Sequence, residues 1–412
     1  MLRAASSLRS GARAQILISA RGALQFSSAA QEPVFKHLEL APADPILGVT
    51  QAFVACKDPT KINLGVGAYR DNDGKPVVLE SVRQAEKRIA GIFNMEYIPI
   101  AGDRKFCELS VDLAYGSDCA PLKEGRVAML QSMSGTGSLR LFGDFMSRYM
   151  PGVKIYLPEP TWTNHHNVFG AAGVGVETYA YYHPETKGVD FEGMCRALSS
   201  APEGSVVLLH ACAHNPTGAD PNAEQWRELS ALFRRRRLFP LFDMAYQGFA
   251  SGDCDRDAYA VRLFAAEGHR LATSQSYAKN MGLYGQRIGC LSVVCADGDE
   301  AARAESQLKR IARAAYSSPP IHGAFLAKQV LGDADLRALW LSEVRGMAER
   351  IADMRALLAA QLKKEGSELD WSHITSQIGM FCYTGLTPEQ SDRLTREHAI
   401  FLTRDGRISM AG

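Results

Sequence analysis

Short apolar runs alternate with amphipathic segments from about residue 125 to residue 297. The runs have the length and composition of strands that are buried on both faces of a sheet. We expect strands at 126–130, 154–158, 205–210, 239–243, 270–274 and 290–296. Between them, residues 136–150 and 223–237 repeat their apolar positions at helical spacing. Such alternation indicates an α/β fold with a largely parallel sheet.

The pattern changes after about residue 300. Residues 299–316 and 336–366 have the spacing of long helices, and the second is long enough to bridge two domains. Residues 379–386 and 406–412 have the pattern of strands in a second domain.

Composition narrows the class of protein. The chain has 412 residues, 46% hydrophobic and 22% charged, with a formal net charge of +1. This is a soluble globular balance without the strong field that nucleic acids or anionic membranes require. Its nine cysteines are odd in number and form no C-x-x-C pair. We therefore expect reduced, mostly buried thiols and no metal.

The first 31 residues differ from the rest of the chain. They are rich in serine and contain no acidic residue, the first being Glu32. Four arginines lie in this segment: Arg3, Arg9, Arg13 and Arg21. Without them, 42 basic residues face 45 acidic ones, a net charge of −3. This composition predicts an organelle transit peptide at 1–31, which the family resemblance described below implies is mitochondrial; the alternative is a disordered basic tail.

The stretch SMSGTGSLR at 132–140 lies between a predicted strand and a predicted helix. Ser134, Gly135 and Thr136 would present backbone N–H groups and hydroxyls at a helix N-terminus, a geometry that binds phosphate. An ordinary glycine-rich turn is the alternative. A dinucleotide loop would need glycine in place of Arg140, and the G-K-[ST] of a P-loop is missing.

Further polar residues lie at or after the ends of the next predicted strands. They are Asn215 in HACAHNPTG, Asp243 and Tyr246 in LFDMAYQGF, and Ser276, Lys279 and Arg287 in SQSYAKNMGLYGQRIG. In a parallel sheet these positions meet at one edge, where such folds bind ligands.

Pyridoxal phosphate would use this whole set, because it needs an amine, a carboxylate against its ring nitrogen and a cradle for its phosphate. Lys279 is the candidate amine, since its uncharged surroundings lower the pKa of a lysine by desolvation. Asp243 is the candidate carboxylate. The candidate phosphate cradle consists of Ser134, Gly135, Thr136, Ser276 and Arg287. Asn215 and Tyr246 would hydrogen-bond the 3-oxygen. Trp162 would stack on the ring, with core packing as its alternative role.

A family resemblance supports this assignment. Six motifs carry it in chain order: LGVGAYRD, SGTGSLR, PTWTNHHNVF, HACAHNPTG, FDMAYQGFASGD and SQSYAKNMGLYGQRIG. They resemble the aspartate aminotransferases, and among these the mitochondrial form, in class I of the pyridoxal-phosphate-dependent aminotransferases. The resemblance runs from about residue 34 to 412 and implies a fold-type I homodimer with shared active sites. It implies ping-pong conversion of aspartate and 2-oxoglutarate to oxaloacetate and glutamate.

The resemblance also implies roles for residues. Lys279 would form the Schiff base and carry the proton, with Asp243 and Tyr246 as further catalytic residues. Substrate-binding residues would be Gly67, Trp162, Asn215, Arg313 and Arg407, where Arg407 takes the α-carboxylate and Arg313 reaches the distal carboxylate across the dimer. Tyr97 would contact the phosphate of the neighbouring subunit's cofactor. His165 and His210 would surround the aspartate, and Pro160 and Pro216 would follow cis peptide bonds.

The expected domains follow the same resemblance. They are a transit peptide at 1–31, an arm and first part of the small domain at 32–76, a large cofactor-binding domain at 77–346, and the rest of the small domain at 347–412. Gln286 and Ser318 replace a usual glutamate and asparagine, which we expect to be tolerated. The family continues beyond the position of Gly412 with a helix over the small domain, so we expect either a fragment of a longer protein or a C-terminal truncation that weakens this domain.

Other functions remain open at this point. An aromatic or broad-specificity aminotransferase would use the same fold and lysine, although Arg313 disfavours it. An inactive truncated subunit is a third reading. A dehydrogenase is disfavoured by the broken dinucleotide loop.

Overall fold

The structure is a computed structural model that describes residues 34–41 and 45–411. The predicted transit peptide at 1–31 lies outside these residues. The chain divides into two compact units, residues 1–43 and 44–412. The described part of the first unit contains only a turn at 34–37. The second unit contains all the helices and strands of the described residues.

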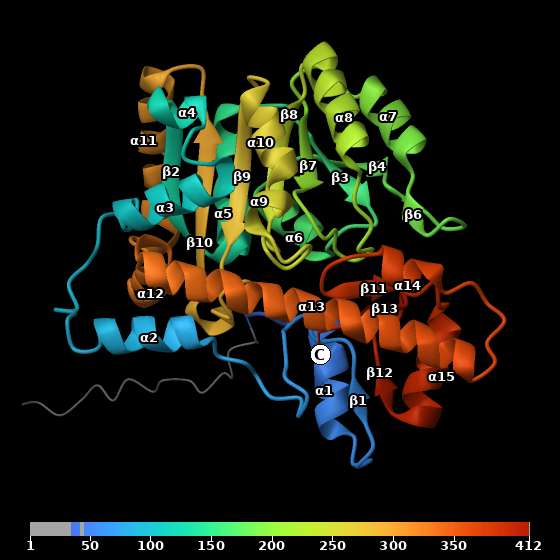
Figure 1. Ribbon diagram of the computed structural model, residues 1–412. Coiled ribbons are helices and arrows are strands. Elements are labelled where there is room, and N and C mark those ends of the chain that lie inside the picture. Colours follow the sequence, from blue (N-terminus) through green and yellow to red (C-terminus); the bar gives the residue numbers. More distant parts are fainter. Residues whose placement is uncertain (1–33, 42–44, 412) are drawn as a thin grey trace, which may run out of the picture. The chain divides into compact units, whose positions relative to one another are not determined.

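A seven-stranded sheet forms the centre of this unit (Figure 1). Its strand order is β2 (Val127–Met133), β10 (Ile288–Val294), β9 (Leu271–Ser276), β8 (Phe239–Met244), β7 (Val206–His210), β3 (Ile155–Glu159) and β4 (Val176–Ala180). All neighbours are parallel except β10, which is antiparallel to both β2 and β9. The predicted α/β fold with a largely parallel sheet is confirmed, and β4 is a strand that the sequence pattern did not indicate.

Helices cover both faces of the sheet, which explains the continuous apolar runs. On β7, Val206 and Leu208 pack into one core and Val207 and Leu209 into the other. The first core is covered by α5 (Ser134–Tyr149), α6 (Asn164–Ala171) and α11 (Gly298–Tyr316). The second is covered by α2 (Glu80–Ile89), α3 (Arg104–Tyr115), α7 (Phe191–Ser200), α8 (Ala223–Arg236), α10 (Tyr259–Ala266) and α12 (His322–Gly332).

Helix α8 shows how the sequence fixes an element locally. Asn222 accepts hydrogen bonds from the first turn, and Gln225 bonds back to it in a capping box. Its apolar residues are buried on one face: Trp226, Leu229, Leu232 and Phe233. At its C-terminal end, Arg234 pairs with Glu267 at 2.5 Å and Arg237 pairs with Glu203 at 2.8 Å. The arginine run is therefore a solvated helix end, as predicted.

The rest of the unit surrounds the long helix α13 (Ala334–Lys364). It contains α1 (Pro45–Ala55), β1 (Ile62–Asn63), α14 (Ser372–Ser376), β11 (Phe381–Tyr383), α15 (Pro388–His398), β12 (Ile400–Phe401) and β13 (Arg407–Ser409). Strand β1 pairs with β12, and β11 pairs with β13. The predicted long helices are confirmed, and the two predicted strands are present but shorter. The division into a large and a small domain stays a prediction.

The remaining elements are short: α4 (Ala120–Lys123), β5 (Tyr182–His183), β6 (Gly188–Val189) and α9 (Cys254–Asp257). All nine cysteines are free, and six of them are buried. Over the described ranges 34–41 and 45–411, no group of side chains has the makeup of a metal site. Within the same ranges, no helix has the length and apolar character needed to cross a bilayer.

Candidate active site

A cavity of about 200 Å³ opens at the edge of the sheet where the parallel strands end. Eleven residues predicted from the sequence line it: Ser134, Gly135, Thr136, Trp162, His210, Asn215, Asp243, Tyr246, Ser276, Lys279 and Arg287. Strands β2, β7, β8 and β9 end at this edge. The antiparallel β10 begins there, so Arg287, which precedes it, joins the residues that follow the other strands.

The N-terminus of α5 forms one end of the cavity. Ser134 has a positive φ of 67°, and its hydroxyl lies 3.1 Å from that of Ser276. A side chain at Gly135 would place its Cβ 3.2 Å from the Cβ of Ser276, so the close approach of these segments favours glycine. Free backbone N–H groups at a helix start, together with the Thr136 hydroxyl, form a site for an anion.

Arg287 adds a positive charge to this end. It has a φ of 50°, and its guanidinium donates to the Tyr284 carbonyl at 3.0 Å while lining the cavity. Tyr284 also lines the cavity, and its hydroxyl accepts the Tyr69 N–H at 2.8 Å. Tyr284 was not predicted as a site residue, although it lies three residues before Arg287 in the same motif.

Asp243 provides a buried negative charge at the opposite end. Burial by itself would raise the pKa of Asp243, but the hydrogen bond from His165 holds it below its usual value. His165 Nε2 lies 3.1 Å from Asp243 Oδ2, and its Nδ1 lies 2.8 Å from the Thr161 hydroxyl. Burial lowers the pKa of His210 to about 3, so this neighbour is neutral. The predicted contact of His165 with the aspartate is present.

Lys279 lies between these charges. Burial lowers its pKa, Asp243 opposes the shift, and the charges of Arg287 and Arg407 lower it further. Its Nζ is 5.2 Å from the centre of the Tyr246 ring. Asn215 Nδ2 donates to the Tyr246 hydroxyl at 3.5 Å. The site therefore holds a lysine that loses its proton more readily than a solvent-exposed one.

Arg407 lies beside the cavity and is almost fully buried. It donates to Asn215 Oδ1 at 3.4 Å and to the Gly65 carbonyl at 3.0 Å. The Phe381 ring lies 4.1 Å from its guanidinium carbon, and a Cβ at Gly67 would lie 3.3 Å from the same ring. Phe381 was missed in the sequence, because only the pairing of β11 with β13 brings it to Arg407.

The other predicted site residues include Trp162, Tyr97 and Arg313. Trp162 lines the cavity and also packs edge-on against His165, with ring centres 5.2 Å apart. Its stacking on a cofactor ring stays a prediction. Tyr97 is 83% exposed and is not among the residues that line the cavity of this chain. Arg313 is also exposed and outside this lining, and it donates to the Ser317 hydroxyl. The peptide bonds before Pro160 and Pro216 are cis, as predicted.

Comparison with known proteins places the site in a family. The family model for aminotransferases of class I and II matches residues 59–412. The chain belongs to this family. It is 59% identical over 378 residues to a mitochondrial aspartate aminotransferase of Arabidopsis thaliana, covering 92% of this chain and 88% of the relative.

Solved structures agree with this family. An aromatic-amino-acid aminotransferase from Burkholderia pseudomallei, covalently bound to pyridoxal phosphate, has a TM-score of 0.90 and 44% identity, covering 92% of this chain and 95% of that one. A mitochondrial aspartate aminotransferase from Trypanosoma brucei has a TM-score of 0.86 at 44% identity, covering 88% and 95%. In this chain the fold-type I architecture is therefore shown, while the roles of single residues rest on the geometry above.

Asp220 holds the backbone just before Asn215, one of the residues that line the site. Its carboxylate accepts the N–H groups of Ala213 at 2.6 Å and His214 at 2.9 Å, just before Asn215. Ala213 has a positive φ of 51°. Burial raises the pKa of Asp220 to about 6, although these two hydrogen bonds oppose the shift. Asp220 therefore holds the loop that carries Asn215, and burying its charged form lowers the stability of the folded protein as pH rises through this pKa.

The Asp220→Asn variant tests this dependence. Between about pH 4 and pH 6 the folded wild type holds a proton that the unfolded chain has released, so its stability falls as pH rises. The variant lacks this titration. We expect the free energy of unfolding of wild type minus that of the variant to fall by roughly 3 kcal/mol across this window. Urea unfolding at both pH values measures it, and a difference that stays constant or grows would contradict the raised pKa.

Proposed function

We propose that this chain is an aspartate aminotransferase that converts aspartate and 2-oxoglutarate to oxaloacetate and glutamate with pyridoxal phosphate. One observation carries the proposal. A single cavity holds a lysine of lowered pKa, a buried aspartate and an anion cradle, and Arg407 lies beside it. Relatives named as mitochondrial aspartate aminotransferases match over 92% of the chain at 55–59% identity.

The chemistry of the donor set fits this cofactor. The phosphate would be held by the N-terminus of α5, which carries Ser134 and Thr136, and by the side chains of Ser276 and Arg287. Asp243 would hold the ring nitrogen in its protonated form, and Asn215 with Tyr246 would bond the 3-oxygen. Trp162 would cover one face of the ring. When bound, pyridoxal phosphate supplies an aldehyde that condenses with amines and a ring that withdraws electrons.

The chain's own residues would move the protons. Lys279 takes the proton from the α-carbon of the amino acid, because burial and the neighbouring arginines favour its neutral amine. Asp243 stays ionised, because the hydrogen bond from His165 lowers its pKa. Tyr246 stays protonated, because burial raises the pKa of its hydroxyl. Each group thus holds the protonation state that its role requires.

Substrate choice would rest on two arginines. Arg407 presents a buried guanidinium beside Asn215, suited to the planar α-carboxylate. Arg313 would bind the distal carboxylate in the cavity of a second subunit, and Tyr97 would reach the phosphate there. The exposure of both side chains supports a homodimer with shared sites. A carboxylate-binding arginine at each end of the substrate selects dicarboxylic acids.

We also propose that the protein works in the mitochondrial matrix. Residues 1–31 carry four arginines and no acidic residue, as transit peptides do. The relatives from Arabidopsis thaliana and Xenopus tropicalis carry mitochondrial names. Fusing residues 1–31 to a fluorescent protein tests whether this segment directs import into mitochondria, and a diffuse cytosolic signal would contradict the proposal.

The proposed activity is tested by visible absorbance. Purified protein with pyridoxal phosphate should show a visible band, and aspartate without an oxo acid should bleach it within one turnover. Addition of 2-oxoglutarate should restore the band. Phenylalanine is the decisive comparison, since a solved relative acts on aromatic amino acids. Bleaching that is equal for aspartate and phenylalanine would favour a broad-specificity enzyme, and no response to either would reject the proposal.

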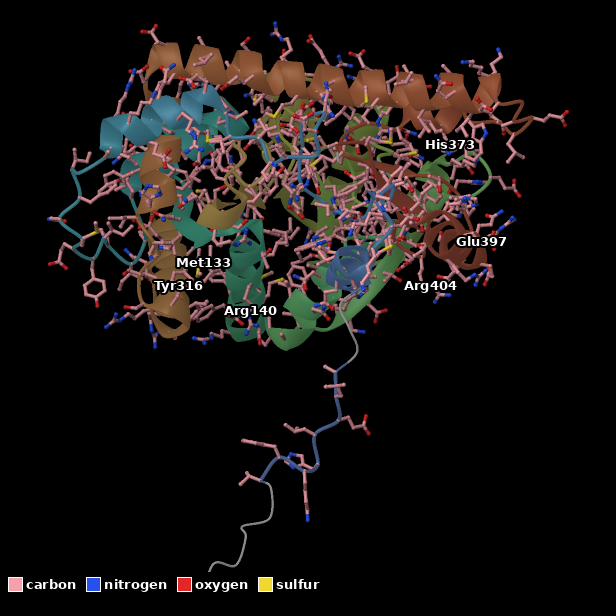
Figure 2. All side chains as sticks on the ribbon, turned by 90° about the horizontal axis from the view of Figure 1, so that it is seen from below. Met133, Arg140, Tyr316, His373, Glu397 and Arg404 are labelled. Atoms are coloured by element: carbon pink, nitrogen blue, oxygen red, sulfur yellow. The ribbon has the colours of Figure 1, made fainter. Side chains whose placement is uncertain are left out.

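The Arg407→Ala variant should lower kcat/KM for aspartate by roughly 10²- to 10³-fold, because a buried charged hydrogen-bonding partner is removed. The matched control is Arg404→Ala. Arg404 lies three positions earlier and pairs with Asp392 at 2.9 Å on the exposed surface (Figure 2). This control should keep wild-type kcat/KM. Equal losses in both variants would indicate damage to the surrounding strands rather than loss of a substrate contact.

A further inference from the structure

The segment that carries Lys279 is held by hydrogen bonds that the reaction itself does not use. Residues 277–283 form a turn between β9 and the entry to β10. The Gly282 N–H donates to the Lys279 carbonyl at 3.0 Å, and the Leu283 N–H donates to the Tyr277 carbonyl at 3.3 Å. These bonds shape the turn, but they do not fix it relative to the rest of the site.

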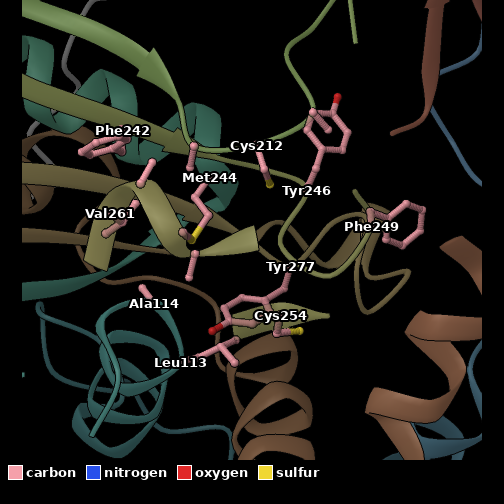
Figure 3. Close-up of a cluster of buried hydrophobic side chains, with 14 of the residues drawn as sticks. Leu113, Ala114, Cys212, Phe242, Met244, Tyr246, Phe249, Cys254, Val261 and Tyr277 are labelled. Atoms are coloured by element: carbon pink, nitrogen blue, oxygen red, sulfur yellow. The ribbon is translucent and has the colours of Figure 1, made fainter. Parts of the chain in front are cut away.

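Asn280, the next residue after Lys279, ties the turn to the Tyr246 segment. It is 2% exposed, and its Nδ2 donates to the Gln247 carbonyl at 3.1 Å. Gln247 follows Tyr246 in the chain, and its own Nε2 donates to the carbonyls of Leu113 at 2.9 Å and Cys254 at 3.1 Å. Leu113, Tyr246 and Cys254 belong to one buried cluster (Figure 3). Asn280 thus connects the lysine to a rigid part of the core.

Trp340 fixes the same residue from another side. This tryptophan lies on α13 and is fully buried. Its indole Nε1 donates to the Asn280 carbonyl at 2.7 Å. A buried carbonyl needs such a donor, and a packed indole offers it in only one orientation. The peptide group that follows Asn280, one residue after Lys279, is therefore held by a long helix that lines no part of the cavity.

We infer that Trp340 and Asn280 are positioning residues that set where the Lys279 amine stands relative to Tyr246 and the substrate's α-carbon. The inference rests on the proposed function, since it assumes that Lys279 moves the α-proton. The lysine side chain is flexible, so its reach is set by the backbone from which it projects. A misplacement of about 1 Å costs on the order of 10²-fold in rate when a reacting group must meet its partner.

The test variant is Trp340→Phe, which keeps an aromatic ring but removes the donor. Its matched control is Trp371→Phe, because the Trp371 indole also donates one bond, to the Ser367 hydroxyl at 2.8 Å, away from the cavity. In the holoenzyme we expect Trp340→Phe to slow the aspartate half-reaction by about 10- to 100-fold. KM for aspartate should stay within about twofold, because Arg407 is untouched. The control should match wild type in both.

Hydrogen exchange gives a readout that does not depend on catalysis. Amides Gly282 and Leu283 should exchange faster in Trp340→Phe than in wild type, and Trp371→Phe should leave them unchanged. Unchanged exchange in a folded Trp340→Phe protein would overturn the inference. If this variant does not fold, Asn280→Ala, which removes the bond to the Gln247 carbonyl, takes its place with the same expectations.

A second background separates positioning from general damage. In Lys279→Ala, a small primary amine supplied in solution replaces the lysine as the base. Adding Trp340→Phe to this background should cause no further loss, because the amine is no longer attached to the turn. A loss as large as in the wild-type background would overturn the inference. If wild type itself does not react with aspartate, the proposed function fails, and the exchange rates alone then decide the positioning role.

Discussion

Replacing Lys279 with alanine should lower the rate of the aspartate half-reaction by roughly 10⁴-fold, the largest effect that we expect for any single substitution. The reason is that, in the proposed function, one amine would serve both as the covalent anchor of the cofactor and as the proton carrier. Its lowered pKa and its place between Asp243 and Arg287 suit both tasks. Single-turnover absorbance after mixing with aspartate measures the rate, and the visible band of the resting protein should also be lost.

The control for this substitution is Lys309→Ala. Lys309 lies on α11 and pairs with Glu305 at 3.3 Å one helical turn away, outside the cavity lining. Its removal should leave the band and the half-reaction unchanged. A Lys279→Ala protein that keeps the visible band of the wild type would show that another amine anchors the cofactor.

Replacing Asp243 with asparagine should slow the same half-reaction by roughly 10³-fold. Asparagine keeps the shape and can still accept from His165, but it has no charge to stabilise a proton on the ring nitrogen. Without that proton the ring withdraws electrons less strongly from the substrate's α-carbon. The buried position makes the charge effective, because little solvent screens it.

The Asp243→Glu variant is the matched comparison, since it restores the charge in a longer side chain. It should recover part of the rate that Asp243→Asn loses. The two variants should differ less in their affinity for the cofactor than in the rate of the half-reaction. Equal rates for the asparagine and glutamate variants would mean that the shape of the site, rather than the carboxylate charge, determines the rate.

Much of the fold follows from local patterns in the sequence. The six predicted strands are present because each is buried on both faces, which leaves a continuous apolar run. Strand β4 was missed because three of its five residues are exposed, so Val176–Ala180 shows no such run. The reversed direction of β10 was not evident either. The direction of β10 is defined by its pairing with β2 and β9, and it cannot be predicted from the residues of one strand alone.

Some residues of the site were also predictable from the sequence, and others were not. Lys279, Asp243 and Asn215 were predictable because each lies in a motif at or shortly after the C-terminal end of a strand, where the chain itself places them at the edge of the sheet. Phe381 and Trp340 were not, because each reaches the site through packing between segments far apart in the chain. Nothing in the residues around Trp340 distinguishes it from any other buried aromatic on a helix. The roles proposed for Arg313 and Tyr97 would lie in the cavity of a second subunit, so the geometry of one chain does not test them.

The hydroxyls of Ser134 and Ser276 meet across 142 positions of sequence. Between them in the sheet runs β10, which comes later in the chain than both. We therefore expect the anion cradle to be completed only when β10 is inserted between β2 and β9. Long-range pairing of this kind is slow to form. Uptake of pyridoxal phosphate would thus follow closure of the sheet, and the rate at which the visible band appears in a refolding chain would report that closure.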